Sequence, residues 1–195
     1  MPKKLPLGLQ TFSELIQGHY LYVDKTRQLL DLIDSGKYVF LSRPRRFGKS
    51  LLVTTLKALW EGRQELFQGL FIAEQLAWRV YPVIHLDFST VTYSEGPEIF
   101  KKTLKHALLF HTRHYEVAVQ ADELNSVFEE LIVRLAERYQ TPVVVLIDEY
   151  DKFANDVMMA SQFLGTSRYQ ALVGGDGILR TVFSAVKSAS AGNGL

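Results

Sequence analysis

The chain has 195 residues, of which 47% are hydrophobic, so it is long enough for one domain with a substantial core and too short for two large domains. Its net charge of +1 creates no global field that would attract nucleic acid or an anionic membrane, so such a partner would require a local patch of charge. The absence of cysteine excludes a disulfide framework and a thiolate metal site, and it fits a reducing compartment.

Residues 1–37 form an N-terminal region in which we expect a short helix over Thr26–Ile33. Asp24 and Lys25, just before it, are either ligand contacts or the cap of that helix, and we favour the cap. Residues 1–6 lack the apolar core of a signal peptide, and no run in the chain reaches the ~20 apolar residues of a membrane span. We therefore expect a cytoplasmic protein without a membrane partner.

A phosphate-binding loop is predicted between a strand and a helix. Residues 38–41 are an apolar, β-prone run, and Leu52, Leu56 and Leu59 then recur at helical spacing. The loop between them ends in Gly-Lys-Ser, as in the Walker A motif, where a strand precedes the loop and a helix follows it. The predicted cofactor-binding residues are Arg43, Pro44, Arg45, Arg46, Phe47, Gly48, Lys49, Ser50 and Leu51.

The residue types of this loop suit a triphosphate. A helix that opens near Lys49 directs its N–H groups and positive dipole end at the loop, and Gly48 has no side chain to keep an anion away. Lys49 is placed to reach the β and γ phosphates, and the Ser50 hydroxyl is a ligand for Mg²⁺. The motif is degenerate, since Arg43 stands where its first glycine is expected. The alternatives are a chance helix start and a solvated basic loop.

The middle of the chain predicts one strand and two amphipathic helices. Residues 83–88 are a second apolar run and a predicted parallel strand. The helices are expected over Pro97–Tyr115 and Asp122–Tyr139, with Asp122 as the N-cap of the second. The second helix has one apolar face, formed by Leu124, Val127, Phe128, Leu131, Ile132 and Leu135.

A second motif follows these helices. Residues 143–147 are a continuous apolar run, which is typical of a strand buried on both faces, and Asp148 and Glu149 come directly after it. In a Walker B motif Asp148 would hold Mg²⁺, and Glu149 would accept a proton from, or orient, the attacking water. The alternative is that the two acids merely end a strand in solvent. The pair of motifs in this order favours a site for ATP and Mg²⁺, with Lys49 and Glu149 as catalytic residues and Ser50 and Asp148 as metal ligands.

Beyond Asp151 the chain is polar and rich in glycine, which indicates a surface excursion, before a returning helix around Ile178–Val186.

The whole chain resembles the AAA-ATPase-like family of microbial proteins. The matching segments are residues 5–12, 22–26, 40–52 and 146–152. The resemblance implies an α/β, P-loop NTPase-like (AAA-type) three-layer sandwich with a mostly parallel central sheet. It also implies ATP binding and hydrolysis, often with a following nuclease-like domain of the PD-(D/E)xK type.

The resemblance further implies a last strand that carries a polar sensor residue, and the chain ends before it. In related ATPases this strand lies between the strand before Lys49 and the strand that ends at Asp148, so its absence would leave two edges unpaired. We therefore expect one domain over residues 1–195, with residues 38–195 as an incomplete nucleotide-binding core. Weak nucleotide binding and impaired hydrolysis are the corresponding hypothesis.

Three functions remain open at this point. The first is an ATPase that uses Lys49, Ser50, Asp148 and Glu149. The second is a nucleotide-binding or interaction module without turnover, because the sensor strand is missing. The third is nucleic-acid binding through the basic loop of Arg43, Arg45 and Arg46. A homo-oligomer is also left open, because no arginine supplied by a neighbouring subunit can be identified from the sequence.

Overall fold

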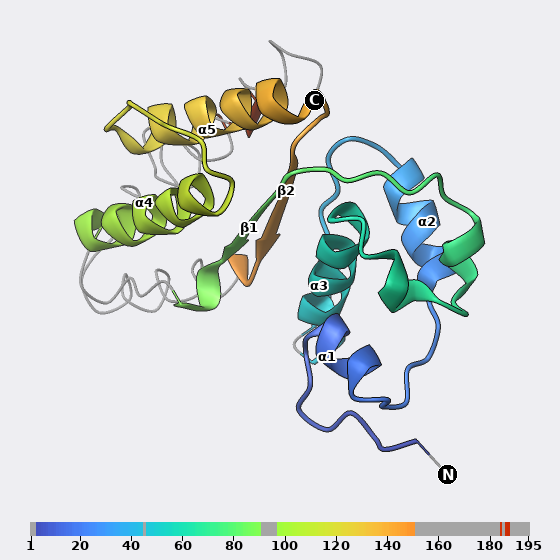
Figure 1. Ribbon diagram of the computed structural model, residues 1–195. Helices are drawn as coiled ribbons and strands as arrows, with labels where there is room; N and C mark the ends of the chain where they lie inside the picture. Colours follow the sequence, from blue (N-terminus) through green and yellow to red (C-terminus); the bar gives the residue numbers. More distant parts are fainter. Residues whose placement is uncertain (1–2, 45, 91–96, 151–183, 185, 188–195) are drawn as a thin grey trace, which may run out of the picture. The chain divides into compact units, whose positions relative to one another are not determined.

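The computed structural model describes residues 3–44, 46–90, 97–150, 184 and 186–187, and it is an α/β structure. Contacts divide the chain into two compact units, Met1–Val83 and Ile84–Leu195 (Figure 1). Each unit has a hydrophobic cluster of its own. Among the described residues, no helix combines the length and the apolar character that crossing a membrane requires. The expectation of a single domain stays a prediction.

The first unit is helical. Its elements are α1 (Phe12–Gln17), α2 (Thr26–Asp34), α3 (Lys49–Trp60) and the 3₁₀ helices η1 (Gln64–Phe67) and η2 (Phe71–Glu74). The sequence predicted α2 and α3 from apolar residues that recur at helical spacing, and the structure confirms both helices. Buried side chains of every element in this unit form one cluster: Phe12, Leu29, Ala58, Leu59, Leu66, Phe67 and Ile72.

The predicted strand over residues 38–41 is wrong. The structure assigns these residues neither strand nor bridge, and Tyr38, Val39 and Phe40 are exposed, Phe40 to 72%. The β-prone composition is a local property, and β-propensity depends so strongly on context that it does not by itself place a segment in a sheet. Within the described residues the sheet has two strands, and both lie later in the chain. The loop therefore follows an exposed segment that the structure does not assign as a strand.

The second unit combines a small sheet with two long helices. Its elements are β1 (Val83–Asp87), η3 (Phe88–Thr90), α4 (Pro97–His114), α5 (Leu124–Tyr139) and β2 (Val144–Asp148). β1 pairs with β2 in a parallel, two-stranded sheet, and α4 and α5 pack together beside it (Figure 1). The predicted strands and both predicted helices are confirmed. The common core is formed by Ile84 and Leu86 of β1, Phe100, Leu104 and Leu108 of α4, the inner face of α5, and Val143.

Helix α5 illustrates how well periodicity predicts a buried face. Five of the six residues of the predicted apolar face are buried: Val127, Phe128, Leu131, Ile132 and Leu135. The predicted N-cap is wrong, because the cap position is Glu123, which makes no side-chain cap hydrogen bond. Asp122 instead forms an ion pair with Lys105 of α4. The Asp122 carboxylate, which the sequence predicted to cap α5, thus pairs with a lysine of the neighbouring helix instead.

Strand β2 is less buried than its composition suggests. Val143, just before it, is buried, but residues 144–147 are half-buried, so the expectation of a strand buried on both faces is wrong within the described residues. A parallel strand is covered on both faces only when helices pack on both.

The polar excursion after Asp151 lies outside the described residues. So does most of the returning helix, of which Ser184, Val186 and Lys187 are helical.

Candidate functional site

The loop before α3 has a backbone shape that a side chain at Gly48 would oppose. Gly48 lies at φ +76° and ψ +25°, in the left-handed region where residues other than glycine are strained. A Cβ added at Gly48 would meet no atom within 4 Å, so the backbone here faces open space. Arg46 also has a positive φ, of 67°. Two left-handed residues in this short stretch turn the chain sharply into α3.

The start of α3 leaves backbone N–H groups for a ligand. The first hydrogen bond into the helix runs from the Leu52 N–H to the Gly48 carbonyl, at 3.0 Å. The amides of Ser50 and Leu51 come before that bond, so the helix supplies no carbonyl for them. Such amides, together with the helix dipole, favour an anion at this end. The predicted helix start at Lys49 is therefore confirmed, and its geometry suits a phosphate.

The charge around the loop points the same way. From Ser35 to Trp60 the chain contains six lysines and arginines and no acidic residue. Arg43, Pro44, Arg46 and Phe47 are exposed, whereas Lys49, Ser50 and Leu51 are half-buried. Arg45 lies outside the described residues. An anion at the start of α3 would thus meet cationic side chains from its own segment and no nearby carboxylate from it.

The predicted acids lie at the end of β2, in the second unit. Asp148 is the last residue of the strand and is 7% exposed. Its Oδ1 accepts a hydrogen bond from the Glu149 N–H at 2.9 Å. Glu149 is half-buried and has a positive φ of 54°, an uncommon conformation for a residue with a side chain. The alternative of two acids in open solvent is wrong for Asp148, because the strand end buries it.

The structure brings the predicted residues together in two groups. The loop residues and Ser50 lie at the start of α3, and Asp148 and Glu149 lie at the end of β2. That the two groups serve one nucleotide stays a prediction. Ser50 and Asp148 supply oxygen donors, which Mg²⁺ prefers, and this ion usually takes only one or two carboxylates and keeps several waters. Among the described residues, no group of three or more His, Cys, Asp or Glu could hold a metal ion.

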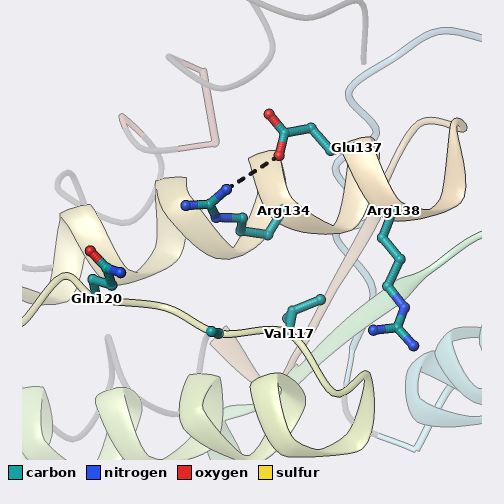
Figure 2. Close-up of a pocket in the computed structure, with 6 residues that line it drawn as sticks. Val117, Gln120, Arg134, Glu137 and Arg138 are labelled. Carbon is teal, nitrogen blue, oxygen red and sulfur yellow. Dashed lines mark ion pairs between the residues drawn. The ribbon is translucent and has the colours of Figure 1, made fainter.

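A surface pocket of about 560 Å³ lies elsewhere, in the second unit (Figure 2). Its lining comes from α5 and from the segment before it: Val117, Ala118, Gln120, Arg134, Glu137 and Arg138. No predicted site residue lines it. Its two guanidinium groups already have acidic partners, since Arg134 lies 3.6 Å from Glu137 and Arg138 lies 3.7 Å from Glu116. Ion pairs internal to the protein thus account for the charge of this pocket.

Asp24, which the sequence left as a ligand contact or a cap, is structural. Its Oδ1 accepts hydrogen bonds from the Thr26 N–H and hydroxyl at 2.8 and 2.7 Å, at the start of α2. Its Oδ2 accepts the Phe71 N–H at 2.7 Å, at the start of η2. The favoured cap is confirmed in part: the cap position is Lys25, which makes no side-chain cap hydrogen bond, and Asp24, one residue earlier, accepts the Thr26 N–H instead. The second partner was missed, because nothing in the sequence links two positions so far apart in the chain.

Comparison with known proteins identifies the family of the chain. The sequence profile of the family described as "Predicted AAA-ATPase" matches residues 6–193. The chain belongs to this predicted AAA-ATPase family. It is also 37% identical over 191 residues to a protein of Azotobacter chroococcum mcd 1 whose printed name is "Uncharacterized protein in vnfD 5'region". That alignment covers 97% of this chain and 35% of the relative, so this member of the predicted AAA-ATPase family spans about a third of its relative's length. No solved structure matches the chain.

Proposed function

We propose that this chain binds ATP together with Mg²⁺ through the loop before α3 and hydrolyses it. The observation that carries the proposal is the left-handed turn at Arg46 and Gly48, which leads into the open start of α3 within a segment free of acidic residues. Backbone strain in a loop is itself a pointer to a functional site. The family's description as predicted AAA-ATPases supports the same ligand.

Each residue has a definite role in this proposal. The amides at the start of α3 and the Lys49 ammonium bind the β and γ phosphates. Ser50 and Asp148 are the protein's oxygen ligands for Mg²⁺, which when bound neutralises charge on the phosphate oxygens. Glu149 accepts a proton from the water that attacks the γ-phosphorus, while the bond from that phosphorus to the bridging oxygen of ADP breaks. The products are ADP and inorganic phosphate.

A P-loop, three-layer fold is part of the same proposal. Its support is the family membership, the parallel pairing of β1 with β2, and the helix that starts at the loop. The activity of the longer proteins of the family, and any further partner, belongs to the proposal as well.

The test is equilibrium binding of a fluorescent ATP analogue, with and without Mg²⁺, to the wild type and to Lys49→Ala. Loss of the ammonium should weaken binding at least about a hundredfold, because a charged partner of the phosphates is removed without replacement. Lys57→Ala is the matched control. Lys57 lies on the same helix but at its other end, where it pairs with Glu61 at 3.8 Å, and its loss should leave binding within about twofold. Equal binding by Lys49→Ala and wild type would overturn the proposal.

The exposed Arg43 and Arg46 favour one second candidate, which is nucleic-acid binding. An oligonucleotide in the same assay distinguishes it from nucleotide binding. A nucleic-acid site would resist competition by ATP, and its affinity would fall steeply as salt rises, because each phosphate contact releases counterions. A nucleotide site would instead release the analogue to ATP.

A further inference from the structure

Two sequence motifs near the N-terminus have no role in the proposed chemistry. They are residues 5–12 and residues 22–26, which both belong to the segments that resemble the family. In the first unit both reach α3, the helix that begins at the proposed phosphate site. Figure 1 shows α1 beside α3, and the two helices pack together. Two adjacent threonines of α3, Thr54 and Thr55, receive these contacts.

Thr54 joins α3 to the start of α1. Its Oγ1 accepts the Phe12 N–H at 3.1 Å, and it lies 3.0 Å from the Gln10 carbonyl and 3.1 Å from the Leu51 carbonyl. The hydroxyl has one hydrogen, which it can donate to either carbonyl. Phe12 is the first residue of α1, and Thr11 makes no side-chain cap hydrogen bond there. Thr54 thus supplies the acceptor that α1 lacks at its own N-terminus.

The partner of Thr54 is held firmly. Phe12 is fully buried, and its ring packs against the rings of Tyr22 and Phe67, with centroid separations of 5.4 and 4.8 Å. It belongs to the same cluster as Ala58 and Leu59 of α3. Aromatic contacts of this kind resist displacement, because any shift opens a void in a packed core. The hydrogen bond to Thr54 therefore ties α3 to a backbone that does not readily move.

Thr55 makes a second tie from the next residue. It is buried, its hydroxyl donates to the Leu51 carbonyl at 2.6 Å, and Tyr22 shares a side-chain hydrogen bond with it. Burial, with a smaller contribution from the charge of Asp24, raises the pKa of Tyr22 to about 12. The phenol therefore keeps its hydrogen at neutral pH.

We propose that Thr54 is a positioning residue for the phosphate-binding loop: the hydrogen bond that it accepts from the Phe12 N–H fixes the rotation of α3, and with it the direction of Lys49 and Ser50. Thr54 follows Ser50 by four residues, so the two lie one turn apart on the same side of the helix. A rotation of α3 that displaces one displaces the other. The inference rests on the proposed function for its effect on nucleotide, but its structural part can be tested alone.

The first readout is nucleotide affinity. Thr54→Val keeps the shape of the side chain but removes donor and acceptor, and it should weaken Mg²⁺–ATP-analogue binding about tenfold with the folded fraction unchanged. Thr54→Ser, which keeps the hydroxyl, should bind within about twofold of wild type. Thr103→Val is the matched control, since Thr103 lies on α4 and its hydroxyl bonds the Ile99 carbonyl of its own helix at 2.9 Å. This control should bind as wild type does.

The second readout is hydrogen exchange, which needs no nucleotide. In Thr54→Val the Phe12 amide and the amides of the first turn of α3 should exchange faster, while the amides of α5 should not. Thr54→Ala repeats the test if valine disturbs the helix.

Wild-type affinity in both Thr54→Val and Thr54→Ala, or unchanged exchange at Phe12 and at the start of α3, would overturn the inference. If the wild type binds no nucleotide, the proposed function fails. The exchange rates then still decide whether Thr54 positions α3.

Discussion

Asp24 links two segments of the first unit with one carboxylate. It accepts hydrogen bonds from Thr26 at the start of α2 and from the Phe71 N–H at the start of η2. Partial burial by itself would raise the pKa of Asp24, but the hydrogen bonds from Phe71 and Thr26 outweigh it, so the pKa lies below its usual value. The folded protein therefore prefers the ionised carboxylate more than the unfolded chain does.

The consequence is a stability that depends on this charge. Because the folded pKa is lowered, the contribution of Asp24 is present above the pKa of the unfolded chain, near 4, and is lost as pH falls through the folded pKa. Asp24→Asn should be less stable than wild type at about pH 7, and the difference in unfolding free energy should shrink as pH falls to about 3. Urea unfolding at several pH values measures it.

The control for this prediction is Asp31→Asn, which changes an exposed acid of α2 by the same chemistry. It should alter the unfolding free energy by no more than about 0.5 kcal/mol. If the difference in unfolding free energy between wild type and Asp24→Asn stays constant with pH, the assigned cause is wrong. The substitution would then destabilise the protein for a reason other than the loss of the carboxylate charge.

At the level of elements, residue spacing predicted the long helices well. α2, α3, α4 and α5 all lie where their apolar residues recur at helical spacing. The six-residue α1 was missed, because a helix this short has little stability of its own and depends on contacts such as the bond from Phe12 to Thr54. The opposite error occurred at residues 38–41, where local preference predicted a strand and the structure assigns none.

The end of α5 offers a test of backbone strain. Gln140 is the C-cap residue and lies at φ +51° and ψ +34°, in the left-handed region that glycine usually occupies at this position. Gln140→Gly should be more stable than Gln140→Ala by about 1 kcal/mol, because only alanine has a Cβ that opposes this conformation. Both variants lose the 2.6 Å bond from the Gln140 side chain to the Glu137 carbonyl, so the loss of that bond cancels when their thermal unfolding is compared.

The contrary outcome for this pair is also informative. Equal melting temperatures would mean that the end of α5 relaxes out of the left-handed conformation when the side chain is changed. Amide exchange in the last turn of α5 would then be faster in Gln140→Ala than in wild type.

For the whole molecule, the proposed hydrolysis of ATP can be tested at Glu149. Glu149→Gln keeps the size of the side chain but removes the base, so in an ATPase it should leave binding within about twofold and slow single-turnover hydrolysis at least about a hundredfold. In a binding module without turnover it should change neither property. Radiolabelled ATP, mixed with excess protein, measures the single turnover directly.

Asp87→Asn is a useful control for this experiment, since Asp87 is also the last residue of a strand and is exposed. It should hydrolyse ATP as wild type does. Hydrolysis by Glu149→Gln at the wild-type rate would remove Glu149 from the mechanism while leaving Lys49→Ala to decide on binding.

The sequence by itself determined the helices with strong periodicity and the start of α3 after the loop, because each depends on neighbours within a few residues. Its apolar runs also predicted β1 and β2, which pair with each other. It also determined the family, through motifs along most of the chain. Only the tertiary structure decided that residues 38–41 are neither strand nor bridge, that Asp122 pairs with Lys105, and that Asp24 and Thr54 tie distant segments together. These outcomes depend on partners far away in the chain, and local patterns carry no information about such partners.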